Sequence, residues 1–595
     1  MPNRQRSLWL LVAAIALLML AACAPAAAPA AEPAAAEPAA EEAAAEEPAA
    51  EEAAAEEPAA EAEAPAGDWY TQELVDAPWI NVCTDTPPTQ GGTLTLATPD
   101  GAMQGENWIS RSSTNDEFIF SQLVDLAMNG TDILPDVATS WDVSDDGLTY
   151  TYHLRDDVLF HDGEQLTAED IKWTIEMFWH PDTGAGVRTT LPLFAIAGTD
   201  EFGEGTADEI SGVQVLDDFT VEITLKEPRA DFFYGMGGMN IFPRHIFEGL
   251  AYSELLESEA ALTGIVGSGP FKLVEFEPDQ FYILEAHEDY YQGRPHLDRL
   301  IFRIGLTSVA SWMPGLEAEE IQIGNMVNGP DRLRVEENEA LTVVGAPLPG
   351  AMAIWPNHDR FEDKRVLQSL IMAVDRQAIV DGIYGGEDQA LVYDYHNIDP
   401  NGEWISPDVP DYPYDPEGAK QLLADAGWDP DQELQFVTYY QSELDRRVTA
   451  AMQQFWNDVG VKVAIEHMDG PTFVTRFYEE ADFDLGYGCC GVASPFEYPR
   501  YACNNMFPDG YNGSRYCNED VDEKVQQSMV EPDLTERQNL WYEISEITNQ
   551  ELLHLTMFQQ DRRYAISSDV CNFQFRQWTN IMWPETSPHT WYLRQ

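Results

Sequence analysis

The sequence predicts a mixed α/β fold with two or three lobes. The chain has 595 residues, which is more than one hydrophobic core normally supports. Its hydrophobic fraction of 44% and aromatic fraction of 11% exclude the intrinsically disordered class. Short alternating strands are separated by helical stretches along the chain, a pattern that is typical of α/β lobes.

Strands are predicted where apolar and polar residues alternate with a period of two. Residues 91–97 and 148–154 show this alternation, and a turn of sequence Asp-Asp-Gly at 145–147 precedes the second strand. Residues 213–225 are predicted to form two strands that meet at Asp217 and Asp218.

Two helices carry clear start and stop signals. Thr167 followed by Asp170 forms a capping-box pattern, which predicts a helix that begins at about residue 168. Further along, Asp415 can cap a helix whose first turn contains Pro416, and Gly427 is suited to end it.

The charge balance excludes several classes of partner. The sequence holds 104 acidic and 32 basic residues, so its formal net charge is −72. Nucleic-acid binding and docking on anionic lipid through a basic patch both need Lys and Arg, which are scarce here. The charge therefore indicates a self-repelling, soluble surface and no nucleic-acid partner.

The N-terminus is predicted to be an export signal with a lipid anchor. Arg4 and Arg6 precede an apolar run at 8–22, which is short for a membrane-spanning helix but suited to a signal peptide. The run ends Leu-Ala-Ala before Cys23 and resembles the bacterial lipobox. We therefore expect residues 1–22 to be removed and Cys23 to carry acyl chains that hold the protein at the outer face of the cell membrane, in the cell envelope.

Residues 23–66 are predicted to be a disordered tether. After Cys23 they consist almost only of Ala, Glu and Pro, a composition that cannot bury a hydrophobic core. No second long apolar segment follows, so we expect the folded body to lie outside the cytoplasm.

The six remaining cysteines suggest disulfides, since an even number in an exported chain favours pairing. Cys503 and Cys517 would close a short loop. The adjacent Cys489 and Cys490 rarely bridge each other, so at least one of them is expected to pair at long range. No C-x-x-C motif occurs, which argues against a zinc or thioredoxin-like site.

Motifs for catalysis are missing from the sequence. It contains no G-x-x-x-x-G-K-[ST] phosphate loop, no H-E-x-x-H and no G-x-S-x-G elbow. We therefore expect no enzymatic activity, no cofactor and no metal. Sixteen Trp and 24 Tyr residues instead offer stacking faces with polar edges, which suit peptides and sugars alike.

Three stretches of the chain resemble one protein family. The matching segments are 133–141, 144–150, 153–155, 160–163 and 166–170 in the first stretch, 267–273, 289–293 and 297–298 in the second, and 365–370, 373–376, 379–380, 414–417, 419–420 and 422–428 in the third. Together they resemble the family 5 extracellular solute-binding proteins of ABC importers, a group that includes peptide, nickel, haem and oligosaccharide binders. The resemblance covers roughly residues 90 to 570.

The resemblance implies a bilobal periplasmic-binding-protein fold, of the large type II class with an extra subdomain in the N-terminal lobe. We assign lobe one to residues 85–131, 236–308 and 536–595, the extra subdomain to 132–235 and lobe two to 309–535. It also implies a monomer that binds its ligand between the lobes and delivers it to the permease subunits in the membrane.

The specificity segment departs from the peptide-binding pattern. In peptide-binding relatives a Trp and an Asp near the end of lobe two face the ligand, and an alignment on Pro495 puts them at Gly488 and Gly491. A buried ammonium needs a charged partner, so capture of a free peptide N-terminus at this place is not expected. Our candidate ligand-binding residues are Trp108, Trp355, Asn357, Tyr395, Trp404, Cys490, Gly491 and Val492.

Several alternatives follow from the resemblance. The ligand would be a peptide, the commonest cargo in the family, or an oligosaccharide, and a third reading is a ligand sensor that feeds a membrane receptor. Cys503 and Cys517 resemble a disulfide loop of dipeptide-binding members. For Cys489 or Cys490, pairing with Cys83 or Cys571 is our working hypothesis.

Overall fold

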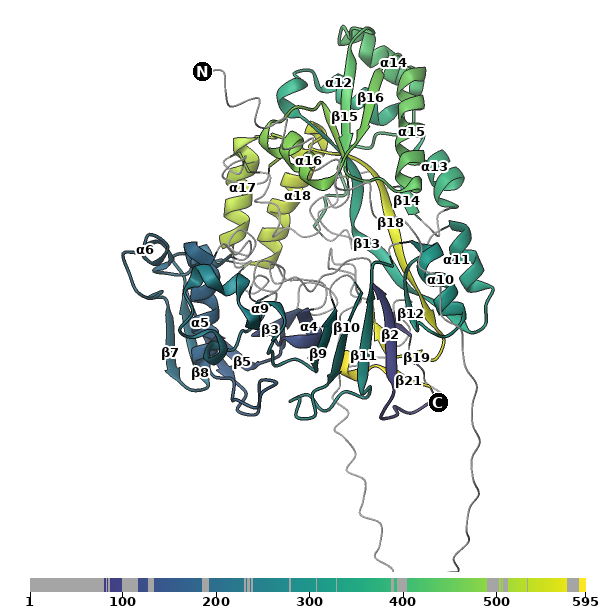
Figure 1. The fold of residues 1–595 in the computed structure, drawn as a ribbon. Coiled ribbons are helices and arrows are strands. Elements are labelled where there is room, and N and C mark those ends of the chain that lie inside the picture. Colours follow the sequence, from purple (N-terminus) through teal and green to yellow (C-terminus); the bar gives the residue numbers. More distant parts are fainter. Residues whose placement is uncertain are drawn as a thin grey trace, which may run out of the picture. The chain divides into compact units, whose positions relative to one another are not determined.

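The computed structural model describes most of the chain after residue 79 (Figure 1). The described residues are 80–81, 83, 86–98, 116–126, 133–183, 192–229, 232, 236, 239–277, 280–306, 308–327, 329–386, 390–392, 404–488, 502–503, 506, 512–531, 533–574 and 588–594. The predicted signal peptide, Cys23 and the tether lie outside them. Within this part of the chain, no helix combines the length and the apolar character needed to cross a membrane.

The largest sheet joins eleven of the described strands in the order β16-β15-β17-β13-β18-β12-β2-β11-β10-β9, with β14 beside β18. In chain order these strands are β2 (Thr93–Thr98), β9 (Phe271–Glu277), β10 (Phe281–Ala286), β11 (Arg299–Ile304), β12 (Ile323–Met326), β13 (Leu341–Pro356), β14 (Ala390–Val392), β15 (Glu433–Thr438), β16 (Lys462–His467), β17 (Leu485–Gly488) and β18 (Leu555–Ser567). Parallel and antiparallel pairs both occur, as β2 runs parallel to β11 and β13 runs antiparallel to β18.

The long strands β13 and β18 connect two groups of strands within this sheet. Leu341 at the start of β13 pairs with Ser567, and the same part of β18 also pairs with β12. The end of β13, from Ala353 to Pro356, pairs with β17. Because β17 is also parallel to β15, the last residues of β13 lie beside the strands that the candidate site uses.

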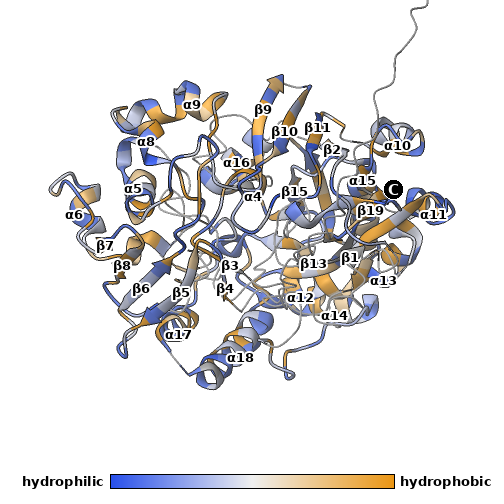
Figure 2. Ribbon diagram, turned by 90° about the horizontal axis from the view of Figure 1, so that it is seen from below, coloured by the Kyte–Doolittle hydropathy of each residue, from blue (hydrophilic) through white to orange (hydrophobic). Residues whose placement is uncertain are grey.

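A separate four-stranded antiparallel sheet has the order β5-β6-β8-β7. Its strands are β5 (Ala138–Val143), β6 (Thr149–Leu154), β7 (Val213–Asp217) and β8 (Thr220–Thr224), which confirms the strands predicted at 148–154 and 213–225. Alternate residues of β6 and of β8 are buried, and the labels of the four strands can be found together in Figure 2. This sheet lies within the predicted extra subdomain, whose boundaries remain a prediction.

The remaining described elements are short strands and helices. The strands are β1 (Ile80–Asn81), β3 (Val124–Leu126), β4 (Ile133–Pro135), β19 (Val570–Cys571), β20 (Phe573–Gln574) and β21 (Tyr592–Leu593). The α-helices are α4 (Asp116–Ile119), α5 (Ala168–Trp179), α6 (Thr199–Gly203), α8 (Arg244–Phe247), α9 (Glu259–Leu262), α10 (Val309–Glu317), α11 (Gly329–Glu336), α12 (Lys364–Met372), α13 (Arg376–Ile379), α14 (Pro416–Asp425), α15 (Glu443–Asp458), α16 (Gly470–Val474), α17 (Glu519–Val530) and α18 (Leu534–Glu551). Short 3-10 or π-helical segments occur at η1 (Pro181–Thr183), η3 (Pro192–Ala195), η4 (Tyr252–Glu257), η5 (His358–Arg360), η6 (Val380–Tyr384), η7 (Thr475–Glu479) and η9 (Pro588–Thr590).

The two helix starts predicted from the sequence are confirmed. Thr167 caps α5, and the carboxylate of Asp170 accepts a hydrogen bond from the Thr167 backbone N–H at 2.9 Å. Asp415 caps α14 by accepting the N–H of Gly418 at 2.9 Å, and Gly427 after this helix has a φ of 69°. Both helices therefore begin where a carboxylate accepts one backbone N–H that the helix itself leaves without a partner.

Two large groups of buried side chains form the main hydrophobic cores. One combines β2, β10 and β11 with the four-stranded sheet and α5, and includes Leu94, Tyr152 and Ile171. The other packs α12, α14 and α15 against β13, β15 and β17, and includes Leu370 and Met452. The second core supports the strand ends at which the candidate residues Trp355 and Asn357 lie.

The pairing hypothesis for Cys83 and Cys571 is wrong. These two cysteines bridge each other across 488 residues of sequence, so neither is available to Cys489 or Cys490, which lie outside the described residues. The physical reason is a pairing of distant strands, because β1 (Ile80–Asn81), just before Cys83, pairs with β20 (Phe573–Gln574), just after Cys571. The Tyr592 hydroxyl shares its hydrogen between the carbonyls of Cys83 and Thr86, at 3.2 and 2.7 Å.

Candidate functional site

The candidate site is built on strand β17, which has large buried side chains on one face and only glycines on the other. In β17, Leu485 and Tyr487 are fully buried in the core formed with α15, whereas Gly486 and Gly488 occupy the alternate face. Trp355 of β13 pairs with Gly486, so its side chain is on the glycine face. A Cβ atom added to Gly488 would lie 2.8 Å from Cη2 of Trp355, which shows that the indole lies directly against this glycine.

Aromatic side chains from neighbouring elements complete this surface, which we call the Trp355 cluster and define as Trp355, Tyr439, Tyr440, Phe473 and Phe477. The Trp355 and Phe477 ring centroids are 5.4 Å apart, and Phe477 stacks on Phe473 at 4.9 Å. Tyr439 contacts Phe473 at 5.0 Å and Tyr440 at 4.6 Å. Tyr439 is 41% exposed, so the cluster reaches solvent.

The indole nitrogen of Trp355 has an unusual environment. The residue is half-buried, and its Nε1–H group is buried without a hydrogen-bond partner among the described residues. An unpaired buried donor costs about 1–3 kcal/mol, and native proteins rarely keep one without a reason. The Trp355 cluster to which this donor belongs contains no charged side chain.

The candidate Asn357 follows Trp355 by two residues, and its described contacts are structural. Its side chain is 1% exposed. The amide donates to the carbonyls of Ala481 and Phe483, each at 3.1 Å, and its oxygen accepts the N–H of Asp359. These bonds use both amide hydrogens of Asn357 and fix the turn after β13. Neither hydrogen is left for a ligand in this arrangement, and a ligand contact of Asn357 remains a prediction.

The candidate Trp404 lies in a different hydrophobic cluster. It is 8% exposed and packs with Ile405, Tyr516 and Trp541 among the residues of α17 and α18. The structure therefore brings Trp355 and Asn357 together and places Trp404 in a core of its own. The candidates Trp108, Tyr395, Cys490, Gly491 and Val492 lie outside the described residues.

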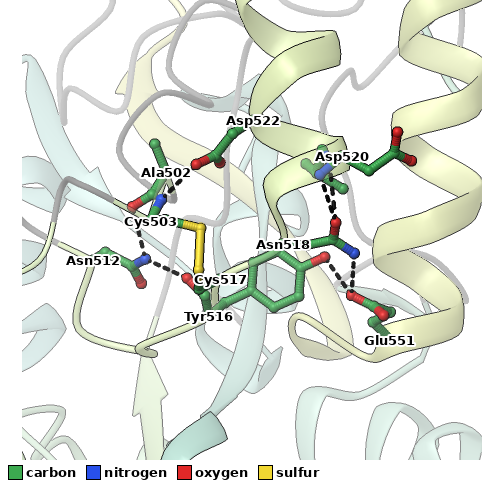
Figure 3. The surroundings of a disulfide bond; sticks show 10 residues. Ala502, Cys503, Asn512, Tyr516, Cys517, Asn518, Asp520, Asp522 and Glu551 are labelled. Carbon is green, nitrogen blue, oxygen red and sulfur yellow. Dashed lines mark hydrogen bonds between the residues drawn. A yellow bond between two sulfur atoms is a disulfide. The ribbon is translucent and has the colours of Figure 1, made fainter.

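The predicted bridge between Cys503 and Cys517 is confirmed (Figure 3). Asn512 donates to the carbonyls of Ala502 and Tyr516, at 3.2 and 2.7 Å. The backbone N–H of Cys503 donates to Asp522 at 3.0 Å. These bonds tie the disulfide loop to the first turn of α17.

The disulfide loop is also tied to the end of α18 and to the turn after β13. Glu551 accepts the hydroxyl of Tyr516 at 2.7 Å and the amide of Asn518 at 2.9 Å (Figure 3). Burial opposes ionisation of Glu551, but hydrogen bonds from Asn518, Lys364 and Tyr516 outweigh it and lower its pKa. Tyr516 also makes an edge contact with His358, with ring centroids 5.2 Å apart.

Buried acids near β17 are engaged by the fold itself. Asp484 precedes β17 and accepts the backbone N–H of Gln435 at 2.7 Å and the guanidinium of Arg360 at 3.4 Å. Asp445 caps α15 with Ser442, and burial raises its pKa. The described residues contain no group of His, Cys, Asp and Glu that could hold a metal ion.

Another carboxyl, that of the half-buried Asp136, lies next to Val137 of the first core. Burial raises the pKa of Asp136 to about 7, although the Tyr291 hydroxyl donates a hydrogen bond to it and opposes the rise. Gln122 and Gln292 also donate to this carboxyl group, at 2.9 and 3.2 Å. Its hydrogen-bond partners come from two separate segments of the chain, which makes it a structural junction.

Sequence reasoning missed the glycine face and its aromatic cover. The pattern Leu-Gly-Tyr-Gly at 485–488 could have indicated it, since two glycines alternating with buried residues leave one face of a strand bare. Tyr440 and Phe477 carry no motif of their own. The contact of Phe477 with Trp355, and the position of Tyr440 beside Gly488, follow from tertiary packing that no local pattern encodes.

The sequence matches a known protein family and several of its members. The model of the bacterial extracellular solute-binding proteins, family 5 (middle), matches residues 132–501. The chain is 28% identical over 480 residues to di/tripeptide-binding protein 1 of Pseudomonas aeruginosa, covering 75% of this chain and 85% of that protein. It is 30% identical over 365 residues to heme-binding protein A of Haemophilus influenzae, covering 58% of this chain and 63% of that protein.

A solved structure shows the same fold. The ABC transporter substrate-binding protein CtaP of Listeria monocytogenes matches with a TM-score of 0.72 at 24% identity, over 85% of this chain and 100% of that chain. The predicted α/β periplasmic-binding-protein fold class is therefore confirmed, and proteins of this family bind solutes and are not enzymes. Since the family model matches more than half of the sequence, the chain belongs to family 5 of the bacterial extracellular solute-binding proteins and is a substrate-binding protein of an ABC importer.

Proposed function

We propose that the protein captures peptides outside the cytoplasm, while anchored to the membrane by lipid on Cys23, and delivers them to an ABC permease. The single observation that carries this proposal is the similarity to the di/tripeptide-binding protein of Pseudomonas aeruginosa, which extends over 75% of the chain. The lipobox-like end of the apolar segment before Cys23 supports the anchor, and the tether at 23–66 would separate the binding domain from the lipid surface.

The Trp355 cluster is suited to hold the uncharged parts of a peptide. Aromatic faces pack against apolar side chains, and polar ring edges can bond to backbone groups. Gly488 stands where peptide-binding relatives have a ligand-facing Trp, and Trp355 covers this glycine from the neighbouring strand. With Gly491 in place of the usual Asp, a peptide N-terminus would need a carboxylate from another part of the protein.

Oligosaccharide uptake is the second candidate. It is favoured by one observation, namely that the Trp355 cluster presents aromatic rings and tyrosine hydroxyls without a charged group of its own. Sugars lack the charged ends of peptides and stack well on such rings. The two candidates therefore differ in whether a charged ligand terminus is recognised.

A thermal-shift screen separates the two candidates. A ligand at about 100 times its Kd stabilises the native state by about 2.7 kcal/mol, which for a chain of roughly 500 folded residues raises the Tm by about 2–3 °C. We expect this shift with di- to pentapeptides and none with maltose to maltopentaose. A shift with the sugars alone would replace the peptide proposal by the oligosaccharide one.

A further inference from the structure

The indole N–H of Trp355 is a buried donor without a partner among the described residues. Neighbouring side chains hold the ring in place, since Phe477 packs at 5.4 Å and His554 at 6.2 Å between centroids. The bare surface of Gly488 lies against the ring. The direction of the N–H group is therefore set by packing before any ligand arrives, which is the condition for low-cost recognition.

An unpaired indole does not mark a site by itself. Trp428 and Trp591 also have buried indole nitrogens without a partner among the described residues. Trp591 is fully buried among Phe118 and Phe573 in the first core. Trp428 is half-buried and packs on the edge of the second core.

Trp355 differs from these two tryptophans in its surroundings. It lies in a cluster that ends in the exposed side chain of Tyr439, and the Tyr439 hydroxyl donates to that of Tyr440 at 3.4 Å. The cluster that contains Trp355 thus also carries two tyrosine hydroxyls, and none of its side chains is charged. A charged ligand group would lose its hydration here without a counter-charge, whereas a carbonyl or hydroxyl oxygen would gain a donor.

We propose that Trp355 is a specificity-determining residue whose Nε1–H donates a hydrogen bond to an uncharged oxygen of the ligand, while the opposite, six-membered end of its indole lies against Gly488. This inference rests on the proposed function. In a peptide the acceptor is a backbone carbonyl, and in a sugar it is a hydroxyl or ring oxygen. Trp355 thereby favours ligands that offer a neutral oxygen acceptor. A ligand without such an oxygen leaves the buried indole N–H unpaired and binds more weakly.

The test compares Trp355→Phe with Trp428→Phe. Both changes keep an aromatic ring and delete an unpaired indole N–H. The probes are a tryptic digest of casein and a maltodextrin mixture, and the measured quantity is the probe concentration that gives half of the maximal Tm shift. We expect Trp355→Phe to raise this concentration about tenfold, which corresponds to about 1.4 kcal/mol, with an unchanged or higher Tm of the free protein. We expect Trp428→Phe to bind like the parent protein.

A spectroscopic readout distinguishes contact from packing. In the ¹⁵N-labelled protein, the Trp355 indole N–H signal, assigned by its loss in Trp355→Phe, should shift on addition of the bound probe, and that of Trp428 should stay in place. Equal binding by Trp355→Phe and the parent protein would overturn this inference and leave the proposed function standing. If neither mixture raises the Tm of the parent protein, the proposed function fails and the inference fails with it.

Discussion

Replacing Cys83 and Cys571 by serine removes the one long-range covalent link in the described part of the chain. The bridge closes a loop of 488 residues, compared with 14 for the bridge between Cys503 and Cys517. In the chain-entropy view, a crosslink stabilises by restricting the unfolded chain, and the effect grows with the logarithm of the loop length. The two disulfides therefore form a matched pair that differs mainly in loop length.

The expected magnitudes follow from these separations. The chain-entropy expression gives about 6 kcal/mol for the long loop and about 3 kcal/mol for the short one. Contacts of the N-terminal arm persist without the bridge, because Tyr592 still bonds to the carbonyls of Cys83 and Thr86. The native state is thus little changed, and the loss acts mainly through the unfolded state.

Calorimetry of the two double-serine variants tests this reasoning. With about 1 kcal/mol/K of unfolding entropy for roughly 500 folded residues, we expect the Tm to fall by about 6 °C for Cys83→Ser/Cys571→Ser and by about 3 °C for Cys503→Ser/Cys517→Ser. The parent protein treated with a reductant serves as the control, and its Tm should fall below both. A larger loss for the short loop than for the long one would refute the entropic account.

Three further changes have expected outcomes. Trp404→Ala should lower the free energy of unfolding by about 3–5 kcal/mol, since it empties a buried site in the cluster around α17 and α18. Urea titration measures this loss, and the same titration of Trp355→Ala, which truncates a half-buried tryptophan outside that cluster, is the comparison. Asp136→Asn should gain stability relative to the parent protein as the pH rises from about 4 to 7. In this window the native carboxyl, with its pKa near 7, still holds a proton that the unfolded chain has released, so parent stability declines with pH; parallel Tm profiles for the two proteins would contradict this. Gly486→Ala should cost about 1–3 kcal/mol, because its methyl group would overlap the Phe477 ring, whereas Gly470→Ala, which has open space around it, should cost less in the same urea assay.

The sequence predicted structural features correctly where they depend on residues that are close together in the chain. The caps at Thr167 and Asp415 were predictable because a side chain bonds to an N–H only three residues away. The bridge between Cys503 and Cys517 followed from the family resemblance and a short separation. The bridge between Cys83 and Cys571 was not predictable, since an even cysteine count leaves the connectivity open and the pairing depends on β1 meeting β20.

The candidate site shows the same division between local and long-range information. The family resemblance indicated that Asn357 follows a strand, and it directly follows β13, but the sequence could not show that its amide is taken up by Ala481 and Phe483. Nor could it show that Trp404 belongs to a separate core. Both facts depend on which distant segments pack against the residue, and sequence spacing carries no record of that.

The acidic character of the chain and the neutrality of the Trp355 cluster together constrain recognition. A net charge of −72 attracts cationic solutes to the whole surface, and salt screens that attraction. The buried acids beside β17, Asp484 and Asp445, already accept backbone N–H groups, so they are poorly placed to bind a ligand cation as well. Selectivity at this cluster must therefore come from shape and from neutral hydrogen bonds. Binding that depends on Trp355 should consequently be insensitive to ionic strength, whereas a ligand held by a carboxylate would be released as salt is added.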